Sequence, residues 1–357
     1  MKKFGIFSCG LIFGLSAVSG VRAAEDLRIA VVAPENSGRE QEVITGLEMA
    51  LKDLNAYTSY NVSIRSYPET CRTEEDRRAA VRIAEENPSF VIGYVCAYSA
   101  MAAQQEYAAR NIPYFTLSIV APSLTSQKNE NVVRLCPRTD RQFADFAEML
   151  KQRYPGRRFI LLDDTTPDSG KFMDVLEKAL DSKRVKRLKV PLRQANKNIK
   201  MLSQQSDFKA DFIVIGSVIP DEAVRLISRV REAGIKTPVI GLDVLGTPEF
   251  SRMIGSMKEG IYYYAFEDRR HSFDAAGLIA GMRFSGIEPT QAAIASYAAA
   301  QIWWQARQNA GEGRLALHDR TYETVMGSVS IDGGGDIRDG LPGVLYRWEG
   351  NTPVPVY

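Results

Sequence analysis

The chain has 357 residues, of which 45% are hydrophobic and 25% are charged, and it contains 27 Gly and 16 Pro. These fractions match ordinary globular proteins and exclude a disordered, collagen-like or disulfide-saturated chain. Lys and Arg number 45 against 43 Asp and Glu, so no basic field attracts nucleic acid, and we predict no nucleic-acid partner. The length predicts two domains, each with its own core.

The first residues have the layout of a secretory signal peptide. Lys2 and Lys3 supply positive charge, residues 4–18 are apolar or small, and a small-residue pattern follows up to Ala23. The apolar segment is shorter than the roughly 20 residues that span a bilayer, and an uncleaved anchor is the alternative. We predict a signal peptide over 1–23, cleaved near Ala23, and an exported mature chain without direct membrane insertion.

Export would leave Cys71, Cys96 and Cys136 in an oxidising compartment, where three cysteines form at most one pair. Cys71 follows one predicted strand and Cys96 ends another. Two parallel strands joined by one helix bring their ends together, so we predict a Cys71–Cys96 disulfide that contributes about 3 kcal/mol. Cys136 is then expected to be a buried thiol, and the alternative is that all three cysteines stay reduced.

Short apolar segments alternate with amphipathic segments along the chain, which predicts parallel sheets built from β-α-β units. In the first part we predict strands over 27–33, 62–66, 90–95 and 114–117, and helices over 41–55, 73–86 and 100–110. After residue 139 we predict helices over 141–153, 170–180, 198–206 and 221–233, and strands over 159–162, 185–190, 212–215, 238–241 and 260–264. Two helices, 272–285 and 289–308, and two β-like segments, 328–331 and 343–348, complete the chain.

The strand-to-helix loops are the places where a ligand would bind, because open parallel sheets bind ligands at the carboxyl ends of their strands. No GxSxG, P-loop, GxGxxG or HExxH motif occurs, and His271 and His318 are the only histidines, which excludes a three-histidine metal centre. We therefore predict a binding protein rather than an enzyme, with no cofactor and no metal.

Several segments point to one family. They include VIGYVCAYSAMAAQQEYAARNIPYFTLSIVAPSLT within 67–125, and later LDDTTPDSGKF, EGIYYY and GSVSIDGGGDI, in the same order and spacing. Together they resemble the leucine/isoleucine/valine-binding family of periplasmic solute receptors, the ligand-capturing components of ABC importers. The resemblance runs over nearly the whole mature chain. It implies an α/β fold of the type I periplasmic binding kind, in which two doubly wound parallel-sheet lobes are joined by three short hinge crossings.

The resemblance also implies the division of the chain into lobes. The first lobe is expected to comprise 24–138 plus 266–327, and the second 139–265 plus 328–357. The crossings are then expected near 136–139, 264–268 and 326–328. The ligand would bind between the two lobes.

The family grips an amino acid with hydroxyls of the first lobe and a carboxylate of the second. Carried over, the ligand-binding positions are Ala97, Ser118, Ile119, Val120, Asp168, Val218 and Asp243, and the neighbouring Tyr98 and Ser99 are further ligand-binding candidates. Ala97 and Val120 lack the family's hydroxyls, and Asp168 and Val218 stand where the family has tyrosines. Asp243 matches the family's acid, although it could instead cap the helix near 247 or be solvated. Asp168 and Ser99 could each be helix caps.

These departures favour a ligand that differs from a standard amino acid, such as an amine, an amide or an aromatic compound. The resemblance implies two partners, a small-molecule ligand and the membrane permease of an ABC importer, and we expect a monomer. The alternative is a ligand-sensing periplasmic module that reports to a signalling partner.

Overall fold

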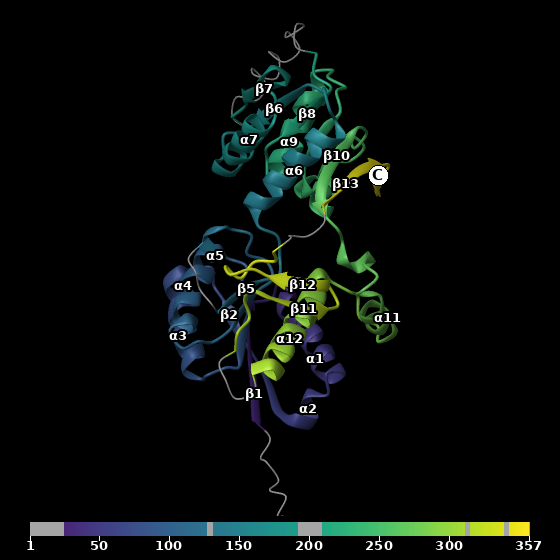
Figure 1. Ribbon diagram of the computed structural model, residues 1–357. Helices are drawn as coiled ribbons and strands as arrows, with labels where there is room; N and C mark the ends of the chain where they lie inside the picture. The colour runs from purple at the N-terminus through teal and green to yellow at the C-terminus, as the bar shows by residue number, and fades with distance from the viewer. Residues whose placement is uncertain (1–24, 127–130, 192–208, 311–314, 339–342, 357) are drawn as a thin grey trace, which may run out of the picture.

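The computed structural model describes residues 25–126, 131–191, 209–310, 315–338 and 343–356 (Figure 1). The predicted signal peptide at 1–23 and the predicted helix at 198–206 lie outside these residues. Within the described ranges, no helix is both long and apolar enough to cross a membrane. Figure 1 shows two α/β lobes, one above the other, that meet at a narrow waist. The predicted two-lobed α/β fold is confirmed.

The first lobe is built on a five-stranded parallel sheet of order β2-β1-β3-β4-β5. Its strands are β1 (Glu25–Pro34), β2 (Tyr60–Glu69), β3 (Phe90–Gly93), β4 (Tyr114–Thr116) and β5 (Val132–Arg134). The sequence predicts all but β5, which is three residues long. The central strands are buried on both faces, which is why they are continuously apolar rather than alternating.

Helices cover both faces of this sheet. One core cluster gathers α1 (Arg39–Asp53), α11 (Ala276–Phe284) and α12 (Gln291–Ala310), and the opposite cluster gathers α3 (Thr73–Glu85) and α4 (Ala97–Ala108). The short helices α2 (Ala56–Ser59) and α5 (Ser123–Ser126) lie in connections. Residues 276–310 thus return to the first lobe after the chain has visited the second.

The second lobe is built on a seven-stranded sheet of order β14-β13-β10-β9-β8-β6-β7. Its strands are β6 (Phe159–Asp163), β7 (Val185–Lys189), β8 (Phe212–Ile215), β9 (Val239–Leu242), β10 (Ile261–Phe266), β13 (Gly343–Glu349) and β14 (Thr352–Pro355). β13 and β14 are antiparallel to their neighbours and the others are parallel. One face packs on α6 (Thr139–Arg153) and α7 (Pro167–Ala179), the other on α9 (Pro220–Glu232) and α10 (Pro248–Ile254). The 3-10 turns are η1 (Ser182–Arg184), η3 (Asp243–Gly246) and η4 (Arg269–His271).

The third crossing lies later in the chain than the resemblance implies. β12 (Gly327–Ile331) forms a hairpin with β11 (Arg320–Thr324), and Val329, Ile331 and Ile337 belong to the core of the first lobe. Asp336 also bridges to Arg134 at the end of β5. The expected boundary at 327/328 is therefore wrong, because these apolar side chains are buried in the first lobe as far as Ile337.

Candidate functional site

The carboxyl ends of both sheets meet at the waist. β5 ends at Arg134 and α6 of the second lobe begins at Thr139, so the first crossing leaves from the carboxyl end of the first sheet. The second crossing leaves from the carboxyl end of β10, where Phe266 pairs with Gly343. Loops at these ends form the candidate ligand site, as expected for open α/β sheets.

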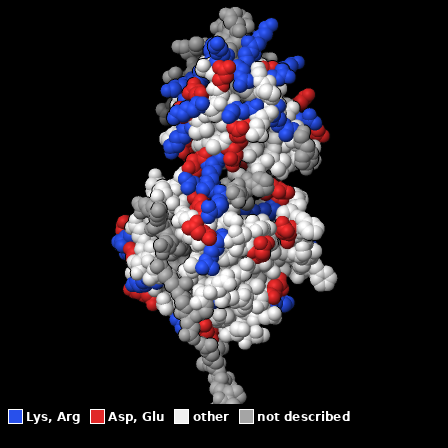
Figure 2. Space-filling model, viewed as in Figure 1, with Lys and Arg blue, Asp and Glu red and all other residues white. Residues whose placement is uncertain are grey.

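A network of ion pairs links β5, the first crossing and α6 to Asp332 and Asp336, which follow β12. The fully buried Arg134 donates through Nε to Asp336 Oδ1 at 2.8 Å, and Arg138 Nη1 lies 2.8 Å from Asp336 Oδ2. Arg141 Nη2 lies 2.8 Å from Asp332 Oδ2. Burial tends to raise the pKa of Asp332, but the Arg141 guanidinium and two backbone N–H groups hold that pKa below its ordinary value. Figure 2 shows acidic and basic side chains crowded at this waist.

The pocket at the hinge is too small for a solute. It is lined by Cys136, Pro137, Arg138, Arg141, Asp145, Phe266, Asp336 and Ile337, and its volume is about 10 Å³, which is room for one water molecule. The site therefore consists of two facing walls of loops rather than a closed cavity.

The loop after β3 supplies part of the first-lobe wall. α4 begins at Ala97, three residues earlier than predicted, so Ala97, Tyr98 and Ser99 form its first turn. Tyr98 is 75% exposed, whereas Ser99 is buried and donates to Asp76 Oδ2 at 2.6 Å. Ser99 is therefore engaged inside the lobe, and we leave it out of the proposed site.

The loop after β4 supplies the rest of this wall. The Ser118 hydroxyl is half-buried and accepts a hydrogen bond from Arg39 Nη2. Val120 is 46% exposed, and its carbonyl oxygen accepts the Thr139 N–H at 3.0 Å, which ties this loop to the second lobe. Ile119 is 1% exposed and packs in the core, so its side chain stands away from the wall.

The predicted disulfide is present. Cys71 and Cys96 are bonded, with their Cα atoms 5.5 Å apart, and Cys136 is unpaired and half-buried. Beside the disulfide, the buried Glu69 accepts the N–H groups of Val95 and Cys96 at 2.8 Å each. Burial raises the Glu69 pKa, and the two N–H groups counteract that rise in part. Glu69 lies close to both sulfur atoms, but these are bonded to each other and offer no thiolate to a metal.

The second-lobe wall presents Asp243, the first residue of η3 after β9. Its side chain is exposed, yet neighbouring protein atoms desolvate the carboxylate and raise its pKa. The nearby Gln142 side chain, on the first turns of α6, opposes that rise. The alternative role as a helix cap does not apply, because Thr247 caps α10 by accepting the Phe250 N–H at 3.2 Å.

Two other predicted positions sit at the edge of this wall. Asp168 is exposed and lies 3.5 Å from Lys171, and Thr166 rather than Asp168 caps α7. Val218 is half-buried against the core, while the next residue, Ile219, is 47% exposed. Neither Asp168 nor Val218 makes a contact that identifies a ligand.

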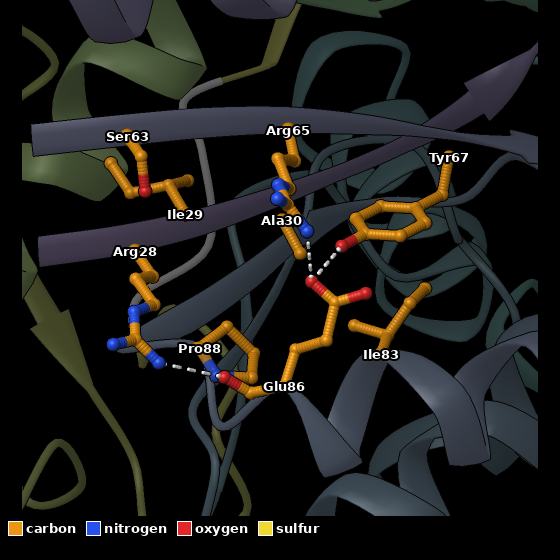
Figure 3. Close-up of a pocket in the computed structure, with 9 residues that line it drawn as sticks. All are labelled: Arg28, Ile29, Ala30, Ser63, Arg65, Tyr67, Ile83, Glu86 and Pro88. Carbon is orange, nitrogen blue, oxygen red and sulfur yellow. Dashed lines mark hydrogen bonds and ion pairs between the residues drawn. The ribbon is translucent and has the colours of Figure 1, made fainter.

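A second pocket lies away from the waist, against β1, β2 and the end of α3 (Figure 3). In Figure 3 the Glu86 carboxylate points toward Arg65 and Tyr67, with distances of 2.7 Å to Arg65 Nη1 and 2.8 Å to the Tyr67 hydroxyl. Arg65 and Glu86 of this pocket thus neutralise each other, and Arg28 pairs with Asp26 beside it. It also opens on the face of the sheet rather than at strand ends, so we do not assign the ligand to it.

Sequence reasoning missed several charged residues at the waist. Arg39, Arg269 and the ion pairs of Arg134 with Asp336 carry no motif, and only their positions directly after strands or crossings could have indicated them. Gln142 lies in a helix with ordinary amphipathic spacing, so the sequence pattern did not distinguish it. The buried Gln142 Nε2 has no hydrogen-bond partner among the described residues.

The comparisons with known proteins agree on one protein family. A sequence model of the periplasmic binding protein family matches residues 28–343. Leu/Ile/Val-binding protein homolog 1 of Brucella suis is 26% identical over 350 residues, covering 95% of this chain and 93% of that protein. The family match extends over both lobes and all three crossings.

Solved structures with the same fold bind different ligands. An ABC transporter substrate-binding protein from Desulfitobacterium hafniense in complex with Leu superposes with a TM-score of 0.73 at 19% identity, covering 93% of this chain and all of that one. A solute-binding protein from R. palustris in complex with benzoate superposes with a TM-score of 0.66 at 14% identity, covering 93% and 95%. The chain belongs to the periplasmic binding protein family and has the type I fold of its branched-chain amino acid-binding members.

Proposed function

We propose that the protein is the solute receptor of an ABC importer and that its lobes close around a small molecule held between the two walls. It binds this solute in the periplasm without transforming it and delivers it to a membrane permease. The family match and the Leu/Ile/Val-binding relatives support this proposal. The solute differs from leucine, isoleucine and valine.

Exposed apolar side chains at the strand ends carry the proposal. Val95, Tyr98 and Val120 of the first lobe are 38%, 75% and 46% exposed, and Ile219 of the second lobe is 47% exposed. Apolar groups exposed at the carboxyl ends of strands in both lobes indicate a surface that becomes covered. Closure of the hinge around a solute would bury these groups.

The first-lobe wall supports a ligand other than leucine. Ala97 and Val120 offer no side-chain hydrogen-bond donor, and the Ser99 hydroxyl is occupied by Asp76. Each missing charge-assisted hydrogen bond costs about 1.5–3 kcal/mol if nothing replaces it. The benzoate complex of a protein with the same fold shows that the fold is not restricted to amino acids.

A thermal-shift screen of amino acids, amines, amides and aromatic acids tests the proposal. A true ligand at 100 times its Kd stabilises the protein by about 2.7 kcal/mol, and small-angle scattering should then show a smaller radius of gyration as the lobes close. Leucine, isoleucine and valine should give the weakest shifts. A screen in which no compound raises the Tm or compacts the protein would overturn the proposal.

The alternative, a sensory module that reports to a signalling partner, stays a prediction. Genes beside this one separate the two roles, since a permease and an ATPase favour import, while a kinase or cyclase favours sensing.

A further inference from the structure

The helix α11 carries apolar side chains on two opposite faces. Leu278, Ile279 and Met282 are buried and pack in the core of the first lobe. On the other face, Phe273 and Phe284 are 93% and 96% exposed, more than any other large apolar side chain among the described residues. Figure 1 shows α11 at the outer flank of this lobe. A helix that is apolar on both sides is typical of one that is covered on both sides.

The exposed face forms one line along the helix. The Phe273 carbonyl oxygen accepts the Ala276 N–H at 3.1 Å, so the turn that contains Phe273 leads directly into α11. Phe273 and Phe284 are eleven residues apart, which is about three helical turns and places both rings on the same line. The exposed Gly277 and Ala280 lie between them on this line. We call Phe273, Gly277, Ala280 and Phe284 the α11 stripe.

The α11 stripe is complementary to itself. Its two large residues stand at the ends and its two small residues stand in the middle, at equal distances from the midpoint. A second copy that packs antiparallel on the stripe therefore places its Phe284 beside Phe273. It also places its Ala280 beside Gly277, and small side chains at such a contact let two helices approach closely. A surface that fits itself about a two-fold axis is what a symmetric dimer requires.

The charged residues beside the α11 stripe do not oppose this pairing. Helical spacing places Asp274 and Arg283 on opposite flanks of the stripe. In an antiparallel pair, each flank meets the same flank of the second copy. Asp274 then lies opposite Gly281, and Arg283 lies opposite Ala276. No like charges meet across the contact, which would otherwise weaken it.

The area of the α11 stripe fits a weak dimer. A large aromatic side chain buries about 150–250 Å², so the four phenylalanine rings of two copies offer roughly 600–1,000 Å². Stable interfaces bury about 1,600 Å² in total, and transient ones bury less than about 1,200 Å². Contact through the stripe therefore supports a reversible association rather than a permanent one.

We infer that two copies of the protein associate through the α11 stripe, antiparallel and about a two-fold axis. The inference goes beyond the proposed function, because the stripe lies outside the loops of the two walls and takes no part in holding a solute. It departs from the monomer expected from the sequence, since no local pattern reveals which of the two apolar faces of α11 is left exposed.

Sedimentation equilibrium of the chain without residues 1–23 tests the inference. The wild type should show a reversible monomer–dimer equilibrium in the micromolar range. Phe273→Ser and Phe284→Ser should each raise the Kd of the dimer at least tenfold. Met253→Ser, at a 45% exposed residue of α10 in the second lobe, is the matched control and should keep the wild-type Kd. A wild type that stays monomeric, or a dimer that neither phenylalanine substitution weakens, overturns the inference.

Gly277→Gln separates association from folding. A side chain at Gly277 would meet no atom of its own chain within 4 Å, and glutamine favours a helix over glycine. The Tm of the monomer should therefore not fall. Between two paired helices the same side chain keeps the backbones apart, so the Kd of the dimer should rise at least tenfold. An unchanged Kd would show that the copies meet elsewhere.

Cross-linking tests the antiparallel arrangement. Phe273→Cys or Phe284→Cys alone places the two introduced thiols at opposite ends of the paired helices, whereas a mixture of the two variants places them side by side. A short thiol cross-linker should therefore join the mixture and leave each variant alone unjoined. The wild type, whose unpaired Cys136 is half-buried, is the control. Cross-linking of each variant to itself in preference to the mixture overturns the antiparallel pairing.

Discussion

Glu69 and Asp243 are both acids at strand ends near the waist, but the two lobes use them differently. Glu69 ends β2, is 4% exposed and accepts two backbone N–H groups beside the disulfide. Asp243 follows β9, and its side chain is exposed. Desolvation raises the pKa of both. The difference lies in their exposure, since Glu69 is buried with its two N–H partners, whereas Asp243, beside Gln142, remains exposed.

This contrast predicts which substitutions should lower the free energy of unfolding and which should weaken ligand binding. The first-lobe loop after β3 is fastened by a disulfide, by Glu69 and by the Ser99–Asp76 hydrogen bond. Groups satisfied in this way contribute to folding, and removing one partner leaves the other unpaired. An exposed acid contributes little to folding. We therefore expect stability losses on the first-lobe side and affinity losses at Asp243.

The disulfide should have the largest effect. Cys71 and Cys96 are 25 residues apart, and closing a loop of this size restricts the unfolded chain by about 3 kcal/mol. Replacing both cysteines by serine should lower the free energy of unfolding in urea by about that amount. The wild type under reducing conditions is the control and should match the double variant. A decrease in the free energy of unfolding below about 1 kcal/mol would show that the other contacts of this loop hold it without the disulfide.

Glu69→Ala should come next. It leaves the N–H groups of Val95 and Cys96 without an acceptor, which costs about 1–3 kcal/mol in the free energy of unfolding. Glu74→Ala is the matched control, because Glu74 forms only an exposed ion pair with Arg77 and should cost less than about 0.5 kcal/mol. Equal Tm values for the two variants would contradict the expected difference between a buried, hydrogen-bonded acid and an exposed one.

Asp243→Asn should reduce affinity and spare stability. If the carboxylate contacts a donor or cationic group of the solute, the best ligand of the screen should bind at least tenfold more weakly, which equals about 1.4 kcal/mol. The Tm of the empty variant should not fall. Unchanged affinity in calorimetry would remove Asp243 from the site and break the contrast with Glu69.

The pH dependence of the empty protein sharpens the same contrast. The folded-state pKa of Asp243 is raised, so the folded protein binds a proton more readily than the unfolded chain. The charged form therefore costs stability above the folded pKa, and this cost disappears as the pH falls below the ordinary value. Asp243→Asn should have a Tm above that of the wild type at pH 7 and an equal Tm near pH 3. A lower Tm for the variant at pH 7 would contradict the raised pKa.

Much of the fold could be predicted from the sequence, because buried parallel strands are apolar runs and helices keep their spacing. Residues 90–95, 159–162 and 212–215 are clear examples. β5 was missed because it is short and ends in the charged Arg134, whose burial depends on its ion pair with Asp336, and β11 because its residues Arg320–Thr324 are mostly polar and exposed. The third crossing was misplaced because the burial of Ile337 depends on tertiary packing.

The candidate site could be predicted only in outline. Loops at strand ends follow from the fold, so Ser118, Val120 and Asp243 were placed near the waist. Which way a loop side chain turns depends on its partners, and Ser99 turns inward because Asp76 lies within 2.6 Å. Arg39 donates to the Ser118 hydroxyl, 79 residues further along the chain, and no local sequence pattern predicts that contact.

Asp168 should have the smallest effect and marks the edge of the site. Its side chain is exposed, its ion pair with Lys171 spans 3.5 Å, and Thr166 already caps α7. Asp168→Ala should therefore change the free energy of unfolding by less than about 0.5 kcal/mol and leave the Kd of the best ligand unchanged. Calorimetry beside Asp243→Asn makes the comparison direct. Tenfold weaker binding would extend the acidic wall to the start of α7 and make the second lobe, like the first, hold its ligand from two loops.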